Sequence, residues 1–252
     1  MSTRRLKMER KPKIAILRWE EGLVPQGLMQ LEELPGNSTN PKSYPFPVRM
    51  IHVPGACVET VITHPSQELL ENMISICKKL RDEEGILAIS TSCGFNAVFQ
   101  QKLAEGTKMP IFSSSLLQVP FVQNIIGKNR TVAVLTANKG ALTKEHFHAC
   151  GITDDMHVEV IGLESAKEWS KIFDEPDEAF DMQKVQIEIV SAAEEAVRAN
   201  PEIGAFVLEC TDLPPFARKI SETTGLPVFD FISMMSHVAI ALGELPIYER
   251  RI

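Results

Sequence analysis

The sequence predicts an α/β protein made of two similar halves, each with a parallel sheet covered by helices. Three observations lead to this prediction: short apolar runs alternate with amphipathic stretches, one part of the chain repeats another, and the composition supports a large core. With 252 residues, of which 44% are hydrophobic, the chain can bury that core as one large domain or as two smaller ones joined by a cleft.

The alternation of elements runs along the whole chain. Short runs rich in β-branched residues predict strands at residues 13–18, 48–53, 86–90, 111–112, 131–136, 157–161, 205–208 and 228–229. Apolar residues at helical spacing predict helices at residues 67–81, 97–104, 116–126, 143–149, 183–199 and 214–223. This alternation is typical of parallel sheets, in which ligands bind beyond the carboxyl ends of the strands.

Two segments interrupt the alternation. Residues 25–47 and 162–181 are rich in Pro, Gly, Asn or acidic residues, so we expect loop excursions there. Loops of this length often overhang a functional site.

A cysteine follows one apolar strand in each part of the chain. Cys93 is followed 17 positions later by Pro110, and Cys210 is followed 17 positions later by Pro227. The two cysteines therefore occupy equivalent places in a repeat, each at the point where a strand ends and a helix begins.

The strands that precede the cysteines support the same repeat. Residues 14–17 (IAIL) match residues 132–135 (VAVL) at an offset of 118 positions, whereas the two cysteines are 117 positions apart. One residue of slippage covers both matches. If the two halves face one another, their thiols do so as well.

The position of the two thiols predicts acid–base chemistry. A free thiol has a pKa near ~8.5, and helix amides that point at it lower this value by stabilising the thiolate. We expect Gly94 to allow close backbone approach after the first cysteine and Asn96 to cap the helix there. After the second cysteine, Thr211 or Asp212 is expected to cap. The same amides would hold a carboxylate.

A carbon acid held between two such thiols could lose a proton to one and regain a proton from the other, which inverts a stereocentre. No metal or organic electron sink is needed for this step, so no cofactor is expected. A redox pair remains an alternative, although the chain contains no C-x-x-C motif. Cys57, Cys77 and Cys150 are expected to be inert, buried thiols.

Charge and composition exclude several classes of function. The 26 Lys and Arg are outnumbered by 33 Asp and Glu, and no basic cluster is present, so nucleic acid is not an expected partner. The first apolar stretch is too short for a signal peptide or a membrane span, and five cysteines suit a reduced setting. We therefore expect a cytoplasmic protein without a membrane partner.

Neither a nucleotide nor a metal site is predicted. The chain has no G-x-G-x-x-G and no Walker A sequence, which leaves nucleotide cofactors unsupported. His146 and His148 would diverge by about 200° on a helix, so both are expected on a solvated face and not around a metal ion.

Three motifs, TSCG at residues 91–94, VAVLTAN at residues 132–138 with LT at 142–143, and ECTDLP at residues 209–214, together resemble the aspartate/glutamate racemase superfamily. Members include amino-acid and hydantoin racemases, maleate isomerase and arylmalonate decarboxylase. The resemblance implies two flavodoxin-like halves related by pseudo-twofold symmetry, a site in the cleft between them, cofactor-independent chemistry and a homodimer. It implies a first half of residues 1–117 plus 230–252 and a second half of residues 118–229.

The chain departs from the amino-acid racemases at three places. The first cysteine is commonly followed there by Asn-Thr, which helps to hold the substrate, whereas Gly94 and Phe95 follow here. Arg18 and Trp19 close the first strand, and Arg18 could clamp a second carboxylate or lie on the surface. Asp212 stands where His or Glu is usual, and could assist its thiol or cap the helix.

The sequence therefore predicts Cys93 and Cys210 as the catalytic pair and a small carboxylate as the substrate. Polar residues after other strands are further candidates for contacts with it, with a turn as the alternative at the serines. The residues expected to bind the substrate are Arg18, Trp19, Ser92, Gly94, Phe95, Asn96, Ser113, Ser114, Thr136, Asn138, Thr211 and Asp212.

The leading hypothesis is a cofactor-independent racemase or epimerase that uses the two cysteines as acid and base on the α-carbon of an amino acid or a related carboxylate. Two alternatives remain open. One is a cis–trans isomerase of an unsaturated dicarboxylic acid with Cys93 as the nucleophile. The other is a non-catalytic protein that binds a small acid.

Overall fold

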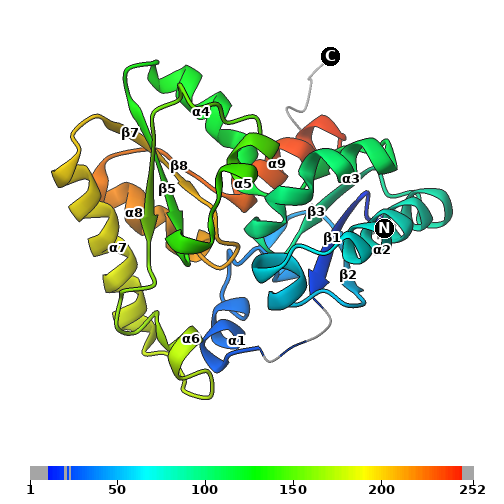
Figure 1. Cartoon of the computed structure of the whole chain (residues 1–252), viewed down its shortest axis with the longest axis horizontal. Coiled ribbons are helices and arrows are strands. Elements are labelled where there is room, and N and C mark those ends of the chain that lie inside the picture. The colour runs from blue at the N-terminus through cyan, green and yellow to red at the C-terminus, as the bar shows by residue number, and fades with distance from the viewer. Residues whose placement is uncertain (1–10, 20–21, 23, 246–252) are drawn as a thin grey trace, which may run out of the picture.

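A computed structural model describes residues 11–19, 22 and 24–245 of the chain. Two four-stranded parallel sheets form the centres of two lobes (Figure 1), with strand orders β2-β1-β3-β4 and β6-β5-β7-β8. The strands are β1 Ile14–Trp19, β2 Val48–Val53, β3 Ala88–Thr91, β4 Ile111–Phe112, β5 Thr131–Thr136, β6 Val158–Gly162, β7 Ile203–Leu208 and β8 Val228–Phe229. The identical strand order confirms the prediction of two similar α/β halves.

The helices cover both faces of each sheet. They are α1 Gln26–Glu32, α2 Gln67–Lys79, α3 Gln100–Thr107, α4 Val119–Ile126, α5 Lys144–Ala149, α6 Lys171–Asp174, α7 Met182–Ala199, α8 Ala217–Thr224 and α9 Phe231–Ala241. Short 3₁₀ turns precede α3, α4 and α8, and a π-helical turn follows α2. The predicted helix at 97–104 is thus a 3₁₀ turn that continues into α3.

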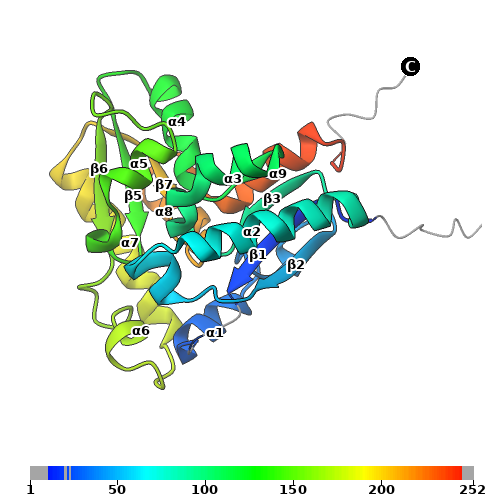
Figure 2. The ribbon, with the colours of Figure 1, turned by 45° about the vertical axis from the view of Figure 1, so that its right-hand side comes forward.

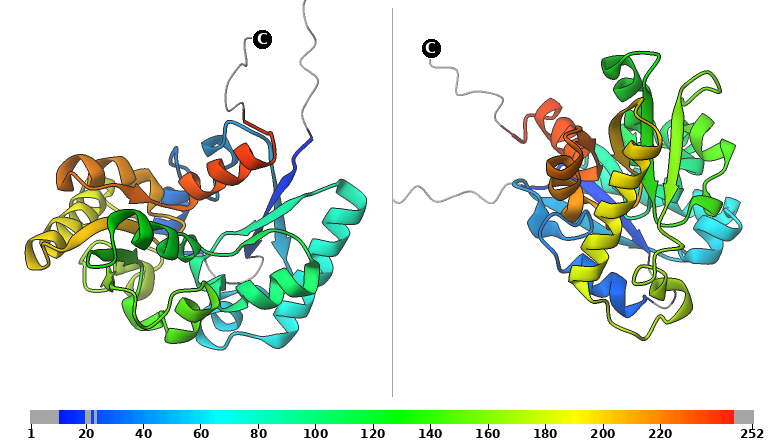
Figure 3. Two further views of the ribbon diagram at one scale, coloured as in Figure 1. Left: turned by 90° about the horizontal axis from the view of Figure 1, so that it is seen from above. Right: turned by 90° about the vertical axis from the view of Figure 1, so that its left-hand side faces the viewer.

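Alternation along the central strands sends side chains into two cores per sheet, because successive residues of a strand point to opposite faces. Ala15 and Leu17 pack with α2 and α3, whereas Ile14 and Ile16 pack with α9. The view from above (Figure 3) shows β1 between α9 on one side and α2 on the other. The C-terminal helix α9 therefore covers the first sheet.

The second sheet is covered in the same way. Ala133 and Leu135 of β5 belong to the core with α7 and α8, whereas Val132 and Val134 belong to the core with α4 and the segment after α5. All six residues of β5 and of β7 are buried. Continuous apolar strands of this kind are expected where helices cover both faces of a parallel sheet.

Strand pairing reproduces the slippage seen in the repeat. Leu17 pairs with Thr91 in the first sheet, and Leu135 pairs with Leu208 in the second. The first members of these pairs are 118 positions apart and the second members 117, as in the sequence. Equivalent strands thus keep equivalent registers, which places Cys93 and Cys210 at the same point beyond their strands.

The two excursions meet each other across the lobes. Residues 25–47 contain α1, and residues 162–181 contain α6; the two short helices lie side by side in Figures 1 and 2. Phe180 N–H donates to Gln30 Oε1 over 2.6 Å, and Gln30 Nε2 donates back to the Phe180 carbonyl over 3.3 Å. These segments therefore hold the two halves together.

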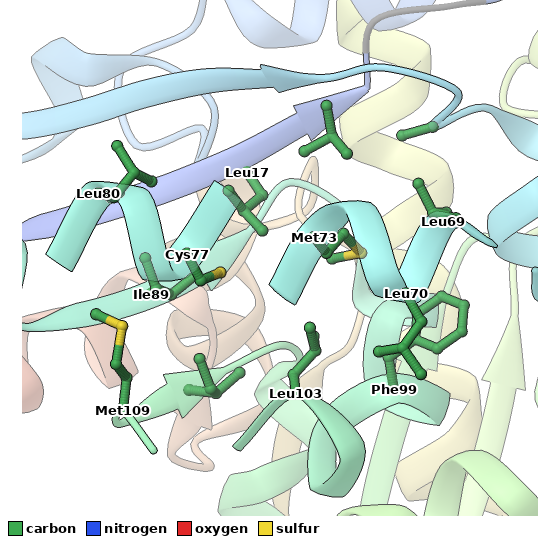
Figure 4. Packing of buried hydrophobic residues seen from close by; sticks show 14 of the residues in the cluster. Leu17, Leu69, Leu70, Met73, Cys77, Leu80, Ile89, Phe99, Leu103 and Met109 are labelled. Atoms are coloured by element: carbon green, nitrogen blue, oxygen red, sulfur yellow. The ribbon is translucent and has the colours of Figure 1, made fainter. Parts of the chain in front are cut away.

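The core of the first half offers a test of its packing. Leu103 of α3 is fully buried and points toward α2, where Met73 and Cys77 belong to the same cluster (Figure 4). We expect Leu103→Ala to lower the free energy of unfolding by about 2 to 5 kcal/mol, because it leaves a cavity. Leu87→Ala, at a side chain that is 44% exposed, should change it by about 0.5 kcal/mol or less. Urea unfolding monitored by circular dichroism measures both, and equal effects would contradict this packing.

Candidate active site

The two predicted thiols lie where the carboxyl ends of β3 and β7 meet. Thr211 Oγ1, next to Cys210, donates to the carbonyl of Ser92, next to Cys93, over 2.8 Å. On the other side, Gly94 packs so tightly on Glu209 that an added Cβ would collide with the Oε1 and the carbonyl oxygen of Glu209. The residues that flank one cysteine therefore contact the residues that flank the other.

These two contacts are related by the repeat of 117 positions. Gly94 corresponds to Thr211, and Ser92 corresponds to Glu209. Each half thus places the residue after its cysteine against the residue before the cysteine of the other half. This reciprocity is what pseudo-twofold symmetry predicts for two strand ends that face each other.

Both cysteines keep part of their surface accessible, and neither forms a disulfide. The backbone amides of Phe95 and Asn96 interact with the Cys93 thiol and lower its pKa, as expected, but burial and the charge of Glu209 outweigh them and raise it. Burial likewise raises the pKa of Cys210, with smaller contributions from its charged neighbours and from Cys93 itself. The backbone amides after each cysteine therefore lower the thiol pKa as predicted, but burial reverses the net shift at both thiols.

Asp212 faces its thiol and does not cap a helix. The Cys210 thiol donates to Asp212 Oδ2 over 3.9 Å, and Asn37 Nδ2 donates to Asp212 Oδ1 over 2.8 Å. Burial raises the pKa of Asp212 to about 6, while the hydrogen bond from Asn37 opposes this shift. The 3₁₀ turn after Cys210 begins with Leu213 at its N-cap and has no side-chain cap, so neither predicted capping residue caps it.

Asn37 belongs to the first excursion, which covers the second cysteine. Ser38 donates to the Thr211 carbonyl from both its amide, over 3.3 Å, and its hydroxyl, over 2.7 Å. Tyr44 in turn donates to the carbonyl of Ser38 over 2.7 Å. The first excursion therefore lies against the residues that follow the second cysteine.

Arg18 lies at the edge of the site and is paired. Its guanidinium donates to Glu32 over 2.7 Å, and both side chains are partly exposed. The positive charge of Arg18 lowers the pKa of Asp212, and the negative charge of Glu32 raises it, so both lie within electrostatic range of the acid that contacts the Cys210 thiol. An open hollow beside them is lined by Arg18, Met29, Glu32, Glu33, Thr39, Asn40, Pro41 and Lys42.

Several buried polar atoms near the first cysteine have no hydrogen-bond partner in the described part of the chain. They include Trp19 Nε1, Asn96 Oδ1 and His146 Nε2. Asn96 does not cap a helix as predicted, since its amide donates to the Cys93 carbonyl over 3.1 Å. His146 is buried, not solvated as expected, and its ring meets that of Phe95 edge-on at 5.8 Å between centroids.

The remaining predicted residues divide into two groups. Thr136 reaches the centre of the site, where its hydroxyl donates to Glu209 Oε2 over 2.7 Å. Ser113 donates to Gln100 over 2.7 Å, and Ser114 accepts from the Leu116 amide; both are fully buried, which gives them a structural role in place of the predicted substrate contact. Asn138 accepts from the Gly140 amide and caps a short turn on the surface.

Glu209, Asn37 and Glu32 are site residues that the sequence reasoning did not select. Glu209 left a signal, because an acidic residue directly follows the apolar strand at 203–208. Burial raises the pKa of this carboxyl to about 7. Asn37 and Glu32 left no comparable signal, since they lie in a segment whose composition indicated only a loop.

Within the described residues, no group of three or more His, Cys, Asp or Glu side chains is arranged to hold a metal ion. No helix in that part of the chain is both long and apolar enough to cross a membrane.

The raised pKa of Glu209 predicts a pH-dependent contribution to stability. A buried acid whose pKa rises from 4.5 to about 7 on folding binds its proton more tightly in the folded state, so it destabilises the fold as pH rises through this range. Glu209→Gln should therefore gain stability relative to wild type between pH 5 and pH 8, by up to about 3 kcal/mol. Urea unfolding at several pH values measures the difference. A difference that is constant with pH would contradict the assignment.

Comparison with known proteins shows to which family the chain belongs. No protein-family model matches the chain. The chain is 31% identical over 204 residues to a dimethylsulfoniopropionate lyase of Durusdinium sp. clade D. This alignment covers 79% of this chain and 67% of the relative. It is 28% identical to dimethylsulfoniopropionate lyase 3 of Emiliania huxleyi, over 84% of this chain and 57% of that protein. The chain spans between 35% and 72% of the length of the curated relatives it matches.

Solved structures of low sequence identity share the fold. An arylmalonate decarboxylase superposes with a TM-score of 0.55 at 16% identity, covering 92% of both chains. The aspartate racemase of Picrophilus torridus gives a TM-score of 0.54 at 16% identity, covering 92% of this chain and 95% of the racemase. The chain therefore belongs to the dimethylsulfoniopropionate lyase family and has the fold of the aspartate/glutamate/hydantoin racemase superfamily.

Proposed function

We propose that this chain is a lyase that removes the α-proton of a small carboxylate and expels a positively charged β-substituent, with dimethylsulfoniopropionate as the first substrate to test. The observation that carries the proposal is a pair of thiols in a site whose other charges are mostly negative. Glu209, Asp212 and Glu32 all act on this region, and Arg18 alone opposes them in the described part of the chain.

The charges around the thiols favour a cationic group on the substrate. Forming a thiolate beside Glu209 and Asp212 is unfavourable, because like charges in a buried site repel. A sulfonium group bound there supplies the opposite charge and lowers the thiol pKa. A simple dicarboxylate would add to the repulsion instead. The substrate carboxylate has a candidate partner in Arg18, whose planar guanidinium suits bidentate binding once Glu32 is displaced.

The elimination balances without a further reactant. A cysteine thiolate takes the α-proton, the electron pair of that C–H bond becomes the new carbon–carbon double bond, and the bond from the β-carbon to sulfur breaks. Dimethyl sulfide leaves as a neutral molecule, and acrylate remains. The positive charge of the sulfonium is lost with its bond, and the negative charge passes from the thiolate to the products, so one general base suffices.

The relatives support this choice of substrate. A protein named dimethylsulfoniopropionate lyase shares 31% identity with the chain over 204 residues. The chain spans only part of the length of most of these relatives, so the activity of the whole relative is carried over here as a proposal.

Removal of either site thiol provides the direct test. We expect Cys93→Ala or Cys210→Ala, whichever removes the base, to lower the rate of dimethyl sulfide release by roughly 100- to 10,000-fold, the usual contribution of a general base. Headspace gas chromatography measures the product. The matched control is Cys77→Ala, whose thiol is buried in the core between α2 and the first sheet (Figure 4) and should leave the rate near wild type. Full activity in both site variants would refute the proposal.

A second candidate is the predicted racemase or epimerase, and the second thiol favours it. Elimination of a neutral leaving group needs one base, whereas Cys93 and Cys210 are equivalent by symmetry and lie within electrostatic range of one another. Two thiols on opposite faces of an α-carbon are what inversion requires.

Deuterated water separates the two candidates. If the chain is a racemase, incubation with an amino acid or a related carboxylate should place solvent deuterium at the α-carbon without loss of a β-substituent, as read by mass spectrometry. If it is a lyase, dimethylsulfoniopropionate should be consumed and acrylate should appear. A protein that only binds small acids would show neither result, and the cis–trans isomerase would change the geometry of an unsaturated diacid.

A further inference from the structure

Glu209 is a buried acid that forms no ion pair with any residue that the structure describes. It follows β7 directly, and its side chain is fully buried. Its Oε2 accepts the hydrogen bond from Thr136, whereas Oε1 has no hydrogen-bond partner among the residues that the structure describes. A buried carboxylate without a cationic partner is costly, so this carboxyl retains its proton to unusually high pH.

The groups around Glu209 are thiols and another acid. The negative charge of Glu209 raises the pKa of Cys93, of Cys210 and of Cys150, which lies at the end of α5. Asp212 acts in the same direction on the two site thiols. Ionisation of any one of these groups therefore opposes ionisation of the others.

Two basic side chains close to other residues of the site, Arg18 beside Asp212 and His146 beside Phe95, are engaged elsewhere. Arg18 pairs with Glu32 over 2.7 Å. His146 Nδ1 bonds the hydroxyl and the amide of Thr143, and burial lowers the pKa of its ring, which favours the neutral form. Neither group compensates the charge of Glu209.

Gly94 shows that the fold makes room for this carboxyl. A side chain at position 94 would occupy the space of Glu209 Oε1. The Gly that replaces the Asn usual after the first cysteine and the acid that precedes the second cysteine therefore form one structural unit. The departure from the amino-acid racemases at Gly94 is thereby explained by packing.

We propose that Glu209 and Cys93 share a single negative charge near neutral pH, and that the Cys93 thiolate forms by passing its proton to Glu209 and not to solvent. The placement that supports this is the packing of Glu209 Oε1 against Gly94, the residue next to Cys93. The exchange turns a thiol and a carboxylate into a thiolate and a carboxylic acid, so proton and charge balance within the site. Glu209 is a positioning residue in this scheme, because its side chain is not exposed. The inference concerns the site of the proposed function, but it applies to any reaction that begins from a thiolate.

Shared ionisation has a measurable consequence. Once Glu209 and Cys93 have together lost one proton, the ratio of the thiolate and carboxylate forms no longer depends on pH, so the Cys93 thiolate population stays constant until a second proton leaves. Without a titrating group at position 209, the Cys93 thiolate population keeps rising with pH above pH 7, up to the thiol pKa.

Alkylation of the full chain with iodoacetamide between pH 5.5 and 9.5 tests this consequence. Peptide mass spectrometry follows the rates at Cys93 and Cys210 separately. In wild type, the rate at Cys93 should rise with pH and level off near pH 7, where Glu209 titrates. In Glu209→Gln this levelling near pH 7 should be lost, and any levelling that remains should lie near pH 6, where Asp212 titrates. Parallel profiles in the two proteins would overturn the inference.

Two further variants keep the test decisive. Glu202→Gln, at an exposed glutamate just before the same strand, should follow the wild-type profile. Thr136→Val removes the hydrogen bond that favours the ionised carboxyl and should move the plateau to higher pH, which provides a readout if Glu209→Gln does not fold. An unchanged plateau in Thr136→Val would count against the inference.

The outcome is independent of the substrate. A plateau that disappears in Glu209→Gln, in a protein that releases no dimethyl sulfide, would support the shared charge and refute the proposed lyase. Release of dimethyl sulfide together with parallel alkylation profiles would do the reverse.

Discussion

The contact between the two strand ends is the constraint on which the site depends. Gly94 rests on Glu209, and Thr211 bonds the carbonyl of Ser92, so each half is held by the residues that flank its cysteine. Because a Cβ at position 94 does not fit, the two halves approach as closely as backbone allows. The same approach brings both thiols within electrostatic range of each other. The contact between the two strand ends thus sets both how closely the halves pack and how close their thiols lie.

Close approach of the halves also determines the electrostatics. Burial raises the pKa of both thiols, and the acids Glu209 and Asp212 raise it further, so the helix amides expected to favour thiolate are outweighed. A site of this kind is poorly suited to a bare thiolate and well suited to a substrate with a positive charge. The proposal of a sulfonium substrate therefore rests on these charges and not on the fold, which also occurs in racemases and in a decarboxylase.

The two excursions give the site its edge. The first carries Asn37 to Asp212 and Glu32 to Arg18, and it is anchored on the second excursion through Gln30 and Phe180. Neither segment belongs to the repeated α/β plan, so each half contributes something that its counterpart lacks. The asymmetry means that the two thiols have different neighbours, although the strands that carry them are equivalent. Different neighbours allow the cysteines to take different roles.

Local periodicity and an internal repeat are properties of the order of residues, so they were enough to predict the two halves, the strand positions and the place of both cysteines. The surroundings of the thiols depend instead on how distant segments pack together. The direction of the thiol pKa shifts depends on burial by segments that are far apart in the chain. Ser113 and Ser114 form hydrogen bonds with Gln100 and with the Leu116 amide, which the sequence pattern did not indicate. Glu209 illustrates the difference. The sequence shows an acidic residue directly after an apolar strand, but only the folded structure shows that this carboxyl is buried against Gly94 and that its Oε1 has no hydrogen-bond partner among the described residues.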